Sequence, residues 1–310
     1  MRTPPILDRR SFLSTMVAMF GAVAFPPSIG LSMAASPLTR PIPKSGERLP
    51  VIGMGSSITF NVGNDSRARA SRTDVLRAFF NTGGGLIDSS PMYGSSEDVI
   101  GEGLGRLGPQ SKLFSATKVW TWRAPAGPSQ MEESRQLWGV DHFDLMQIHN
   151  LVSWEDHLET LLAMKAKKRI RYIGVTTSHG RRHGELIRIM DKQPIDFVQF
   201  SYNVIDREAE RRLLPMAAER GLAVIVNRPF KRGALFDRFK KRPLPSWVGE
   251  FDCTNWAQFF LKFIVSNPAV TCAIPATSRV DHMRENMSAA HGRLPDPEMR
   301  TRMLRYVDDL

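Results

Sequence analysis

Several features that define whole classes of protein are scarce in this 310-residue sequence. It contains two cysteines, Cys253 and Cys272, which are too few for a disulfide framework. We favour two reduced, partly buried thiols over a bond between them. The seven histidines are dispersed, and the closest pair, His179 and His183, lies in a segment of loop composition, so we expect no metal site. No apolar run reaches the ~18 residues typical of a membrane-spanning helix.

A concentrated basic region is also largely missing, although the formal net charge is +11. The first 34 residues contribute +2 of this charge, so the basic bias belongs to the rest of the chain. Lysine and arginine are scattered apart from one denser stretch at 231–242, and no recognised nucleic-acid-binding motif accompanies it. Hydrophobic residues at 42% and charged residues at 24% are typical of a soluble globular protein. We therefore expect no nucleic-acid partner.

The first 34 residues have the composition of a signal peptide. Arg9 and Arg10 stand directly before Ser-Phe-Leu, an apolar run of about 14 residues follows, and Ser32-Met33-Ala34 fits a small-residue cleavage site. Paired arginines in this setting resemble the twin-arginine signal, which implies the twin-arginine export machinery as a partner. We expect cleavage of residues 1–34, no stable membrane span afterwards, and a periplasmic or extracellular protein. An uncleaved anchor and a misassigned start codon are the alternatives.

Strand-like and helix-like segments alternate along residues 35–310. Short runs rich in Val, Ile and Phe predict strands at 51–54, 86–88, 113–119, 145–149, 170–176, 197–202, 223–227 and 270–274. Helical periodicity predicts helices at 73–81, 96–107, 154–168, 184–191, 208–220, 256–265 and 280–290, with a less certain one within 121–138. Eight strands alternating with helices favour an α/β fold with one (β/α)₈ TIM-barrel domain.

A doubly wound sheet is the competing architecture. It requires a glycine-rich phosphate-binding turn that opens a helix after the first strand. Here Gly53-Met54-Gly55 supplies two of the three glycines, and no helix begins directly after them. We therefore interpret these glycines as part of a tight turn.

Polar residues gather where the predicted strands end. The carboxyl ends of barrel strands share one mouth, so Asp88, Lys118 and His149 are expected to meet there. Tyr93 follows Asp88 by five residues. A phenol can donate a proton to a carbonyl if a nearby cation lowers its pKa, a carboxylate can hold that cation, and an imidazole can polarise the carbonyl. No side chain donates hydride, so this chemistry needs a cofactor.

The sequences around these four residues resemble the aldo-keto reductase family. They are Asp88-Ser-Ser-Pro-Met-Tyr93-Gly, Ala116-Thr-Lys118 and Asp144-Leu-Met-Gln-Ile-His149. Further blocks at 174–177, 199–203 and 274–278, followed by Glu285-Asn286, extend the resemblance over nearly all of residues 38–290. It implies a reductase of aldehydes or ketones that uses NADP(H), with Tyr93 as general acid supported by Asp88, Lys118 and His149.

The resemblance also implies where the cofactor binds. Thr176, Thr177 and Gln199 would hold the nicotinamide, and Lys231, Arg232 and the Gly233-Ala234-Leu235 backbone would contact the diphosphate. Arg228 is a further candidate for cofactor binding. The adenine side, including the 2′-phosphate, would be bound by Thr277, Ser278, Arg279, Glu285 and Asn286. Trp120, Trp122 and Trp154 are candidates for lining the mouth.

Three positions depart from the usual family pattern: Thr177 replaces Asn, Asn227 replaces an aromatic ring, and Ala276 replaces Lys. The expected export keeps a second hypothesis open, an exported nicotinamide-nucleotide-binding protein with little or no turnover, because free NADPH is scarce outside the cytoplasm. A metal-dependent hydrolase on the same barrel is a third hypothesis, which the dispersed histidines disfavour.

Overall fold

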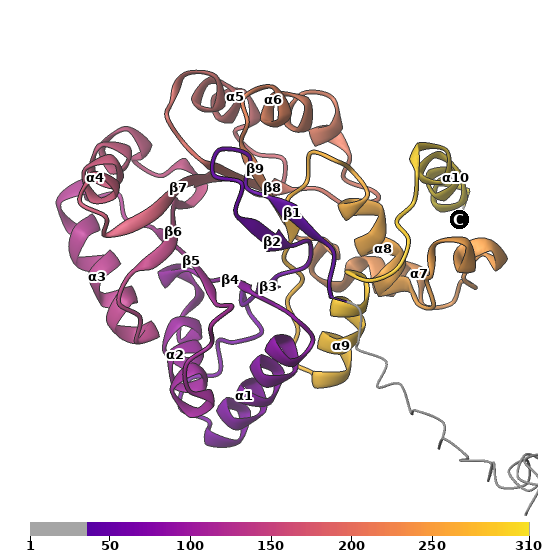
Figure 1. The fold of residues 1–310 in the computed structure, drawn as a ribbon, viewed down its shortest axis with the longest axis horizontal. Coiled ribbons are helices and arrows are strands. Elements are labelled where there is room, and N and C mark those ends of the chain that lie inside the picture. Colours follow the sequence, from indigo (N-terminus) through magenta and orange to yellow (C-terminus); the bar gives the residue numbers. More distant parts are fainter. Residues whose placement is uncertain (1–35, 310) are drawn as a thin grey trace, which may run out of the picture. The chain divides into compact units, whose positions relative to one another are not determined.

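The computed structural model describes residues 36–309, and these belong to one compact unit. The predicted signal peptide at residues 1–34 lies outside the described residues. The unit is an eight-stranded parallel barrel surrounded by helices (Figure 1). The fold class predicted from the sequence, a (β/α)₈ barrel, is therefore confirmed.

Eight parallel strands follow one another around the barrel in chain order. They are β3 (Met54–Gly55), β4 (Leu86–Asp88), β5 (Phe114–Val119), β6 (Phe143–Ile148), β7 (Ile170–Thr176), β8 (Phe197–Ser201), β9 (Ala223–Asn227) and β10 (Cys272–Ala273). Bridges Ile52↔Ala273 and Gly55↔Ala276 join the first strand to the last and close the barrel. Every predicted strand is present, although the first and last are shorter than predicted.

The glycines of the first strand serve this closure. A Cβ at Gly53 would lie 2.8 Å from the carbonyl oxygen of Leu86, and one at Gly55 would lie 2.9 Å from that of Ile274. Both approaches are closer than a side chain tolerates, so the two glycines let neighbouring strands pack tightly. The sheet closes on itself, and the doubly wound alternative is excluded.

Helices form the outer layer. They are α1 (Ser66–Asn81), α2 (Ser96–Leu107), α3 (Gly127–Trp138), α4 (Trp154–Ala166), α5 (His183–Lys192), α6 (Leu213–Glu219), α7 (Ala234–Phe239), α8 (Trp256–Val265), α9 (Val280–Ser288) and α10 (Pro297–Asp308). The helix predicted at 73–81 begins seven residues earlier, where Asp65 caps it by accepting from the amide of Ala68. The uncertain region 121–138 holds α3. Neither α7 nor α10 was predicted.

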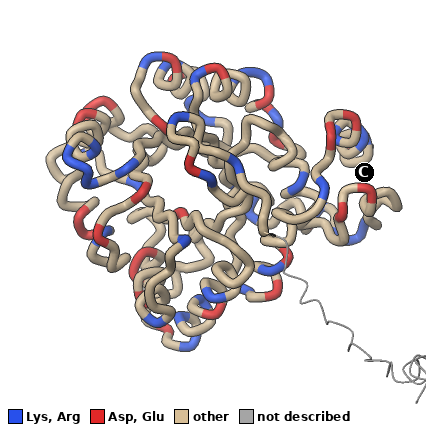
Figure 2. Tube along the Cα trace, viewed as in Figure 1, with Lys and Arg blue, Asp and Glu red and all other residues tan. Residues whose placement is uncertain are grey.

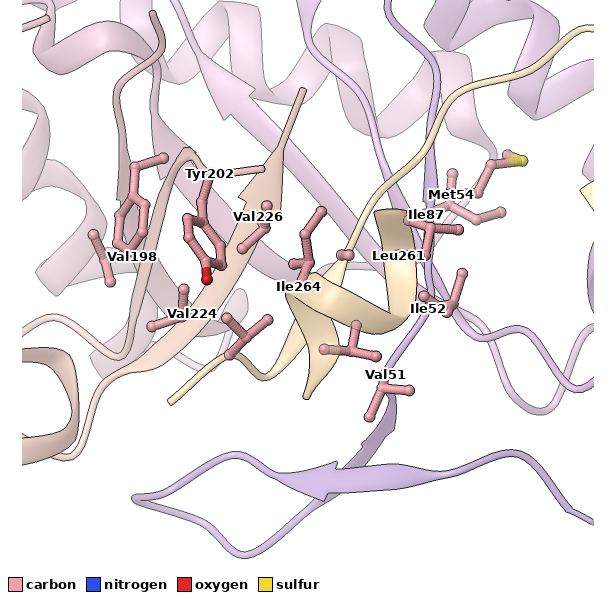
Figure 3. Packing of buried hydrophobic residues seen from close by; sticks show 14 of the residues in the cluster. Val51, Ile52, Met54, Ile87, Val198, Tyr202, Val224, Val226, Leu261 and Ile264 are labelled. Atoms are coloured by element: carbon pink, nitrogen blue, oxygen red, sulfur yellow. The ribbon is translucent and has the colours of Figure 1, made fainter. Parts of the chain in front are cut away.

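The main core lies between the strands and this helical layer. Figure 3 shows Leu261 and Ile264 of α8 packed between Val224 and Val226 of β9 on one side and residues of the first strands on the other. All of these side chains are at most 1% exposed. Burial on both faces explains why the strands read as continuous apolar runs rather than alternating ones.

A short antiparallel hairpin, β1 (Thr39–Pro41) with β2 (Arg48–Pro50), covers the amino-terminal end of the barrel. Its side chains Ile42 and Leu49 belong to the cluster of apolar residues that fills the barrel interior. Tyr172, at the start of β7, donates its hydroxyl to Glu47 at 2.7 Å. The sequence predicts no strand before residue 51, so this hairpin was not expected. The hairpin closes the bottom of the barrel and leaves the opposite end for the site.

The remaining sequence predictions concern thiols, charge and membranes. Cys253 and Cys272 are both free and buried, as predicted. Lysine and arginine are interspersed with acidic residues over the outer helices in the view of Figure 2. Within residues 36–309 no helix has the length and hydrophobicity to cross a bilayer. The same residues contain no cluster of side chains that could hold a metal ion.

Candidate active site

A cavity of about 640 Å³ opens at the carboxyl ends of the barrel strands. It is lined by strand ends and by the loops that follow them. Among the residues predicted from the sequence, the lining includes Asp88, Tyr93, His149, Thr176, Thr177, Gln199 and Arg228. Lys118 lies just behind this surface and is wholly buried. The parallel barrel has thus brought together residues that are more than 130 positions apart in the sequence.

Asp88, the last residue of β4, accepts hydrogen bonds from three other side chains of the site. Its Oδ2 accepts a hydrogen bond from Lys118 Nζ at 2.6 Å, and its Oδ1 accepts from the amides of Gln147 at 2.9 Å and Gln199 at 3.1 Å. Lys118 also donates to the carbonyl oxygen of Ser89 at 2.7 Å. One carboxylate therefore ties together strands β4, β5, β6 and β8 at the floor of the cavity.

The Lys118 ammonium stays charged despite its burial. Burial acts to lower its pKa, but the opposing effects of Asp88 and Tyr93 outweigh it, so the pKa lies above the usual value. The Nζ atom lies 5.3 Å from the centroid of the Tyr93 ring. The cation that the sequence analysis required is therefore next to the phenol.

Tyr93 ends a one-turn 3₁₀ helix, Pro91–Tyr93, and faces the cavity. Burial raises the pKa of its phenol, and the charge of Lys118 only partly offsets this. We had expected the cation to bring the pKa down, and burial overrides it because the phenolate loses its hydration. The phenol consequently keeps its proton at neutral pH, which is the state a proton donor needs.

His149 follows directly on β6 and its ring meets that of Tyr93 edge-on, with centroids 5.6 Å apart. Burial, together with the charge of Lys118, lowers the pKa of the imidazole to about 2. His149 is therefore neutral at physiological pH. Its Nδ1 lies 2.8 Å from the hydroxyl of Ser90.

One wall of the cavity carries polar groups with spare hydrogen-bonding capacity. Thr176 uses its hydroxyl to accept from the amide of Asn150 at 3.0 Å. The Thr177 hydroxyl, on a residue only 2% exposed, has no partner among the described residues. Because a buried hydroxyl without a partner costs free energy, this atom fits a ligand group such as a carboxamide. Gln199 lies beside it in the lining.

Asn227, at the end of β9, is held by its neighbours. Its amide donates to the carbonyl oxygen of Thr177 at 2.9 Å and its carbonyl accepts from the hydroxyl of Ser201 at 2.7 Å. It lines the cavity but offers no ring for stacking. Its side chain instead fixes the position of the Thr177 backbone.

Three guanidinium groups in the lining have no carboxylate partner within the described part of the chain: Arg181, Arg228 and Arg232. Burial and the charge of Arg232 lower the pKa of Arg228. Both Arg228 and Arg232 have positive φ angles, of 53° and 59°. Clustered like charges on strained backbone are unfavourable without an anion, so this loop fits a phosphate-bearing ligand.

Lys231, another predicted diphosphate ligand, forms an ion pair instead of lining the cavity. Its Nζ lies 2.9 Å from Asp206, and it does not line the cavity. Arg232, which was predicted to contact the diphosphate together with Lys231, does line the cavity.

The predicted adenine-side residues all lie outside the lining of this cavity, namely Thr277, Ser278, Arg279, Glu285 and Asn286. Arg279 is exposed and paired with Asp281. The Thr277 hydroxyl accepts from the amide of Arg279 at 3.1 Å, and Asn286 is buried. Thr277, Ser278 and Arg279 directly precede α9 and follow Ala276, which lines the cavity. Glu285 and Asn286 lie in the second half of α9.

The apolar rim differs from the one predicted. Trp120, Trp122 and Trp154 do not line the cavity. Trp120 and Trp122 contact each other, and the Trp154 indole donates to Glu185. The rim consists instead of Ile58, Met92 and Phe236, which are 62%, 46% and 36% exposed. These three side chains are exposed because they border the opening of the cavity. No periodic pattern in the sequence distinguishes them from buried apolar residues.

Sequence reasoning missed two residues of the polar network, Gln147 and Ser90. Gln147 is one residue before the end of β6, and Ser90 reads as an ordinary turn residue before Pro91. The sequence of β6 did carry a signal, because Gln147 interrupts the apolar run that starts at Leu145 and ends at Ile148.

Comparison with known proteins agrees with this geometry. Residues 51–302 match the sequence model of the Aldo/keto reductase family. Methylglyoxal reductase YeaE of Escherichia coli (strain K12) is 26% identical over 258 residues, which cover 81% of this chain and 89% of that protein.

Solved structures of aldo-keto reductases share the fold. One is AKR11C1 from Bacillus halodurans in its holo form, with a TM-score of 0.72, 20% identity, and coverage of 87% of this chain and 96% of that one. Another is the Klebsiella pneumoniae enzyme in complex with NADPH, with a TM-score of 0.71, 21% identity, and coverage of 88% and 95%. The chain belongs to the aldo/keto reductase family, whose members are oxidoreductases that use NAD(P)H.

Proposed function

We propose that this protein is an NADPH-dependent reductase that converts an aldehyde or ketone into an alcohol, with Tyr93 as the proton donor. The observation that carries the proposal is the cluster of Tyr93, Lys118, Asp88 and His149 at one end of the barrel. Lys118 and Asp88 are paired at 2.6 Å, and the Tyr93 and His149 rings both face the cavity.

The cavity wall suits a nicotinamide nucleotide. Thr177 and Gln199 would hold the carboxamide, and Arg228 and Arg232 would hold the diphosphate. When bound, the reduced nucleotide supplies the hydride that no side chain can supply.

The protein's own groups handle the proton. Tyr93 keeps its proton because burial raises the pKa of the phenol. His149, neutral because burial lowers its pKa, donates a hydrogen bond to the carbonyl oxygen. As negative charge develops on that oxygen, Tyr93 transfers its proton there. The Lys118 ammonium then stabilises the phenolate, and Asp88 keeps the ammonium in place.

The preference for NADPH over NADH is assigned to Arg279. Ala276 provides no charge at this edge of the cavity, and Arg279 is the nearest predicted cation. Its pairing with Asp281 is exposed to solvent, so exchanging this partner for a phosphate costs little. We expect Arg279→Ala to weaken NADPH binding by about tenfold and NADH binding by less than twofold, measured by quenching of tryptophan fluorescence. Equal losses for both nucleotides would contradict the assignment.

The substrate class follows from the rim. Ile58, Met92 and Phe236 offer apolar surface around the opening. We propose small carbonyl compounds with an apolar or flat substituent. Methylglyoxal, the substrate in the name of one relative, and an aromatic aldehyde are suitable test compounds.

We also propose that the protein is exported by the twin-arginine machinery and acts in the periplasm or outside the cell. The proposal rests on the sequence of residues 1–34, because this route carries folded proteins and would allow a cofactor to be bound first. A fusion of this segment to a folded reporter should reach the periplasm, and replacement of Arg9 and Arg10 by lysine should block it. Full export of the lysine variant would refute this route.

The decisive test of the reductase is Tyr93→Phe. We expect it to abolish NADPH-dependent reduction of both aldehydes while nucleotide binding, followed by tryptophan fluorescence, stays within threefold of wild type. Turnover equal to wild type would refute the mechanism. Tight nucleotide binding without turnover in the wild-type protein would instead support the second hypothesis, a nucleotide-binding protein.

A further inference from the structure

Ser90 joins the two residues that face the reacting oxygen. It is fully buried, with an exposed fraction of 0%, and it precedes the one-turn helix that carries Tyr93. Its Oγ lies 2.8 Å from Nδ1 of His149 and 3.2 Å from the amide nitrogen of Met92. Among the described residues, Ser90 supplies the one hydrogen bond made to the His149 ring.

The direction of these two hydrogen bonds can be worked out. An amide nitrogen can only donate, so the Ser90 oxygen accepts from Met92. The oxygen could accept a second hydrogen bond from Nδ1 of His149, but the buried hydroxyl hydrogen of Ser90 would then have no acceptor among the described residues. Donation to Nδ1 satisfies this hydrogen, and Nδ1 must be unprotonated to accept it. His149 is neutral, since burial lowers its pKa to about 2, and so it carries one proton, which has to be on Nε2.

We propose that Ser90 is a positioning residue that fixes His149 in the tautomer with its proton on Nε2. This inference rests on the proposed reductase function and adds a residue to it. Nδ1 faces Ser90, so Nε2 is on the side of the ring that faces away from it, toward the cavity that His149 lines with Tyr93. The imidazole then presents a donor to the carbonyl oxygen. In the other tautomer it would present a lone pair to that oxygen and repel it.

The same hydroxyl also orients Tyr93. By accepting from the Met92 amide, Ser90 caps the turn Pro91–Tyr93, and the carbonyl oxygen of Ser90 accepts from the amide of Tyr93 at 2.9 Å. A single side chain therefore aligns the proton donor and the polarising imidazole with each other.

The direct test is the tautomer of His149 in the wild-type protein, read from nitrogen chemical shifts after ¹⁵N labelling of histidine. A His149→Gln variant identifies the signal. We expect a single species with bare Nδ1 and protonated Nε2 at neutral pH. A proton on Nδ1 would overturn the proposal. This measurement needs neither substrate nor turnover, so its outcome is separate from that of the reductase function.

Variants test the consequence for catalysis. Ser90→Ala should show both tautomers and lower kcat by about 2- to 13-fold, which corresponds to the ~0.5–1.5 kcal/mol of one net hydrogen bond. NADPH affinity should not change. Ser90→Thr, which keeps the hydroxyl, should restore the single tautomer and most of kcat.

The matched control is Ser115→Ala. Ser115 is also buried, but it lies near the start of β5, away from the cavity, and its hydroxyl donates a hydrogen bond to Asp144. We expect it to leave the tautomer of His149 unchanged. If Ser90→Ala kept a single Nε2-protonated species, the proposal would fail even if kcat fell.

Discussion

Lys118 and Asp88 form an ion pair at 2.6 Å in which the side chains are 0% and 3% exposed. A buried pair of this kind gains little net stability as a whole, but the loss of one partner leaves a charge without compensation. The stability of the barrel therefore depends on keeping both members of this pair at the base of the cavity.

Asp88→Asn should lower the free energy of unfolding by about 3–5 kcal/mol, because it leaves the Lys118 ammonium buried and uncompensated. Urea unfolding followed by circular dichroism measures this. The matched control is Asp191→Asn, which removes an exposed pair with Arg220 and should cost less than about 1 kcal/mol. The double variant Asp88→Leu with Lys118→Met should be more stable than Asp88→Asn. A double variant less stable than the single one would contradict this account.

His149 should make the protein less stable as the pH falls. Its pKa in the folded state is about 2, below the value of 6.5 for free histidine, so the unfolded chain binds one more proton between these values. The contribution of the neutral imidazole is complete above pH 6.5 and is lost at up to about 1.4 kcal/mol per pH unit below it.

His149→Gln should therefore flatten the dependence of stability on pH between about 6 and 4. Urea titrations at several pH values would show it. His142→Gln, which changes an exposed histidine, serves as the control. An unchanged slope in His149→Gln would mean that the ring is protonated in the folded protein.

Thr177→Val should stabilise the ligand-free protein slightly while weakening nucleotide binding. The Thr177 hydroxyl is buried without a partner, so its removal relieves a cost of the order of 1 kcal/mol. If the hydroxyl contacts the carboxamide, NADPH affinity should fall by about 2- to 13-fold. Thr271→Val provides the contrast, since the Thr271 hydroxyl accepts from the amide of Val224 and its loss should destabilise the protein. A less stable Thr177→Val with unchanged affinity would contradict both expectations.

Lys262 is a second buried lysine, and it links two segments that are far apart in the sequence. Its Nζ donates to the carbonyl oxygens of Phe251, His291 and Arg293 at 2.8–2.9 Å. Lys262→Met should leave these carbonyls unsatisfied, lower stability by about 2–4 kcal/mol, and expose the loops around residues 251 and 292 to proteolysis. Lys240→Met, at an exposed pair with Asp237, should have no such effect. Unchanged proteolysis at these loops would show that the lysine does not hold them.

The fold was predictable because the strands are buried on both faces. The apolar runs around Ile87, Leu145 and Val224 are long enough to be recognised without any periodicity. The hairpin containing Ile42 and Leu49 was not predicted, because each of its strands has three residues and contains a proline. Likewise, α10 was not predicted because most of its residues are polar, although Asp296-Pro297 marks its start. Met299, Met303 and Val307 recur at helical spacing and were a second, weaker signal.

The residues of the candidate site were predictable for a different reason. Asp88, Lys118 and His149 end strands or nearly so, and the barrel brings all strand ends to one mouth. The sequence could not tell how much burial would change their titration, and so the pKa of Tyr93 was expected to fall. It also could not show that Lys231 pairs with Asp206, because that contact depends on the path of two loops.

The hairpin at the bottom of the barrel has a kinetic consequence. With Ile42 and Leu49 filling that end, cofactor and carbonyl compound have to share one entrance and one exit. In the proposed binding mode the nicotinamide lies against Thr177 and Gln199, between the floor of the cavity and the carbonyl compound, so the nucleotide arrives first and departs last. Steady-state reduction should therefore follow an ordered sequence in which the oxidised nucleotide is the last product released and competes with NADPH alone.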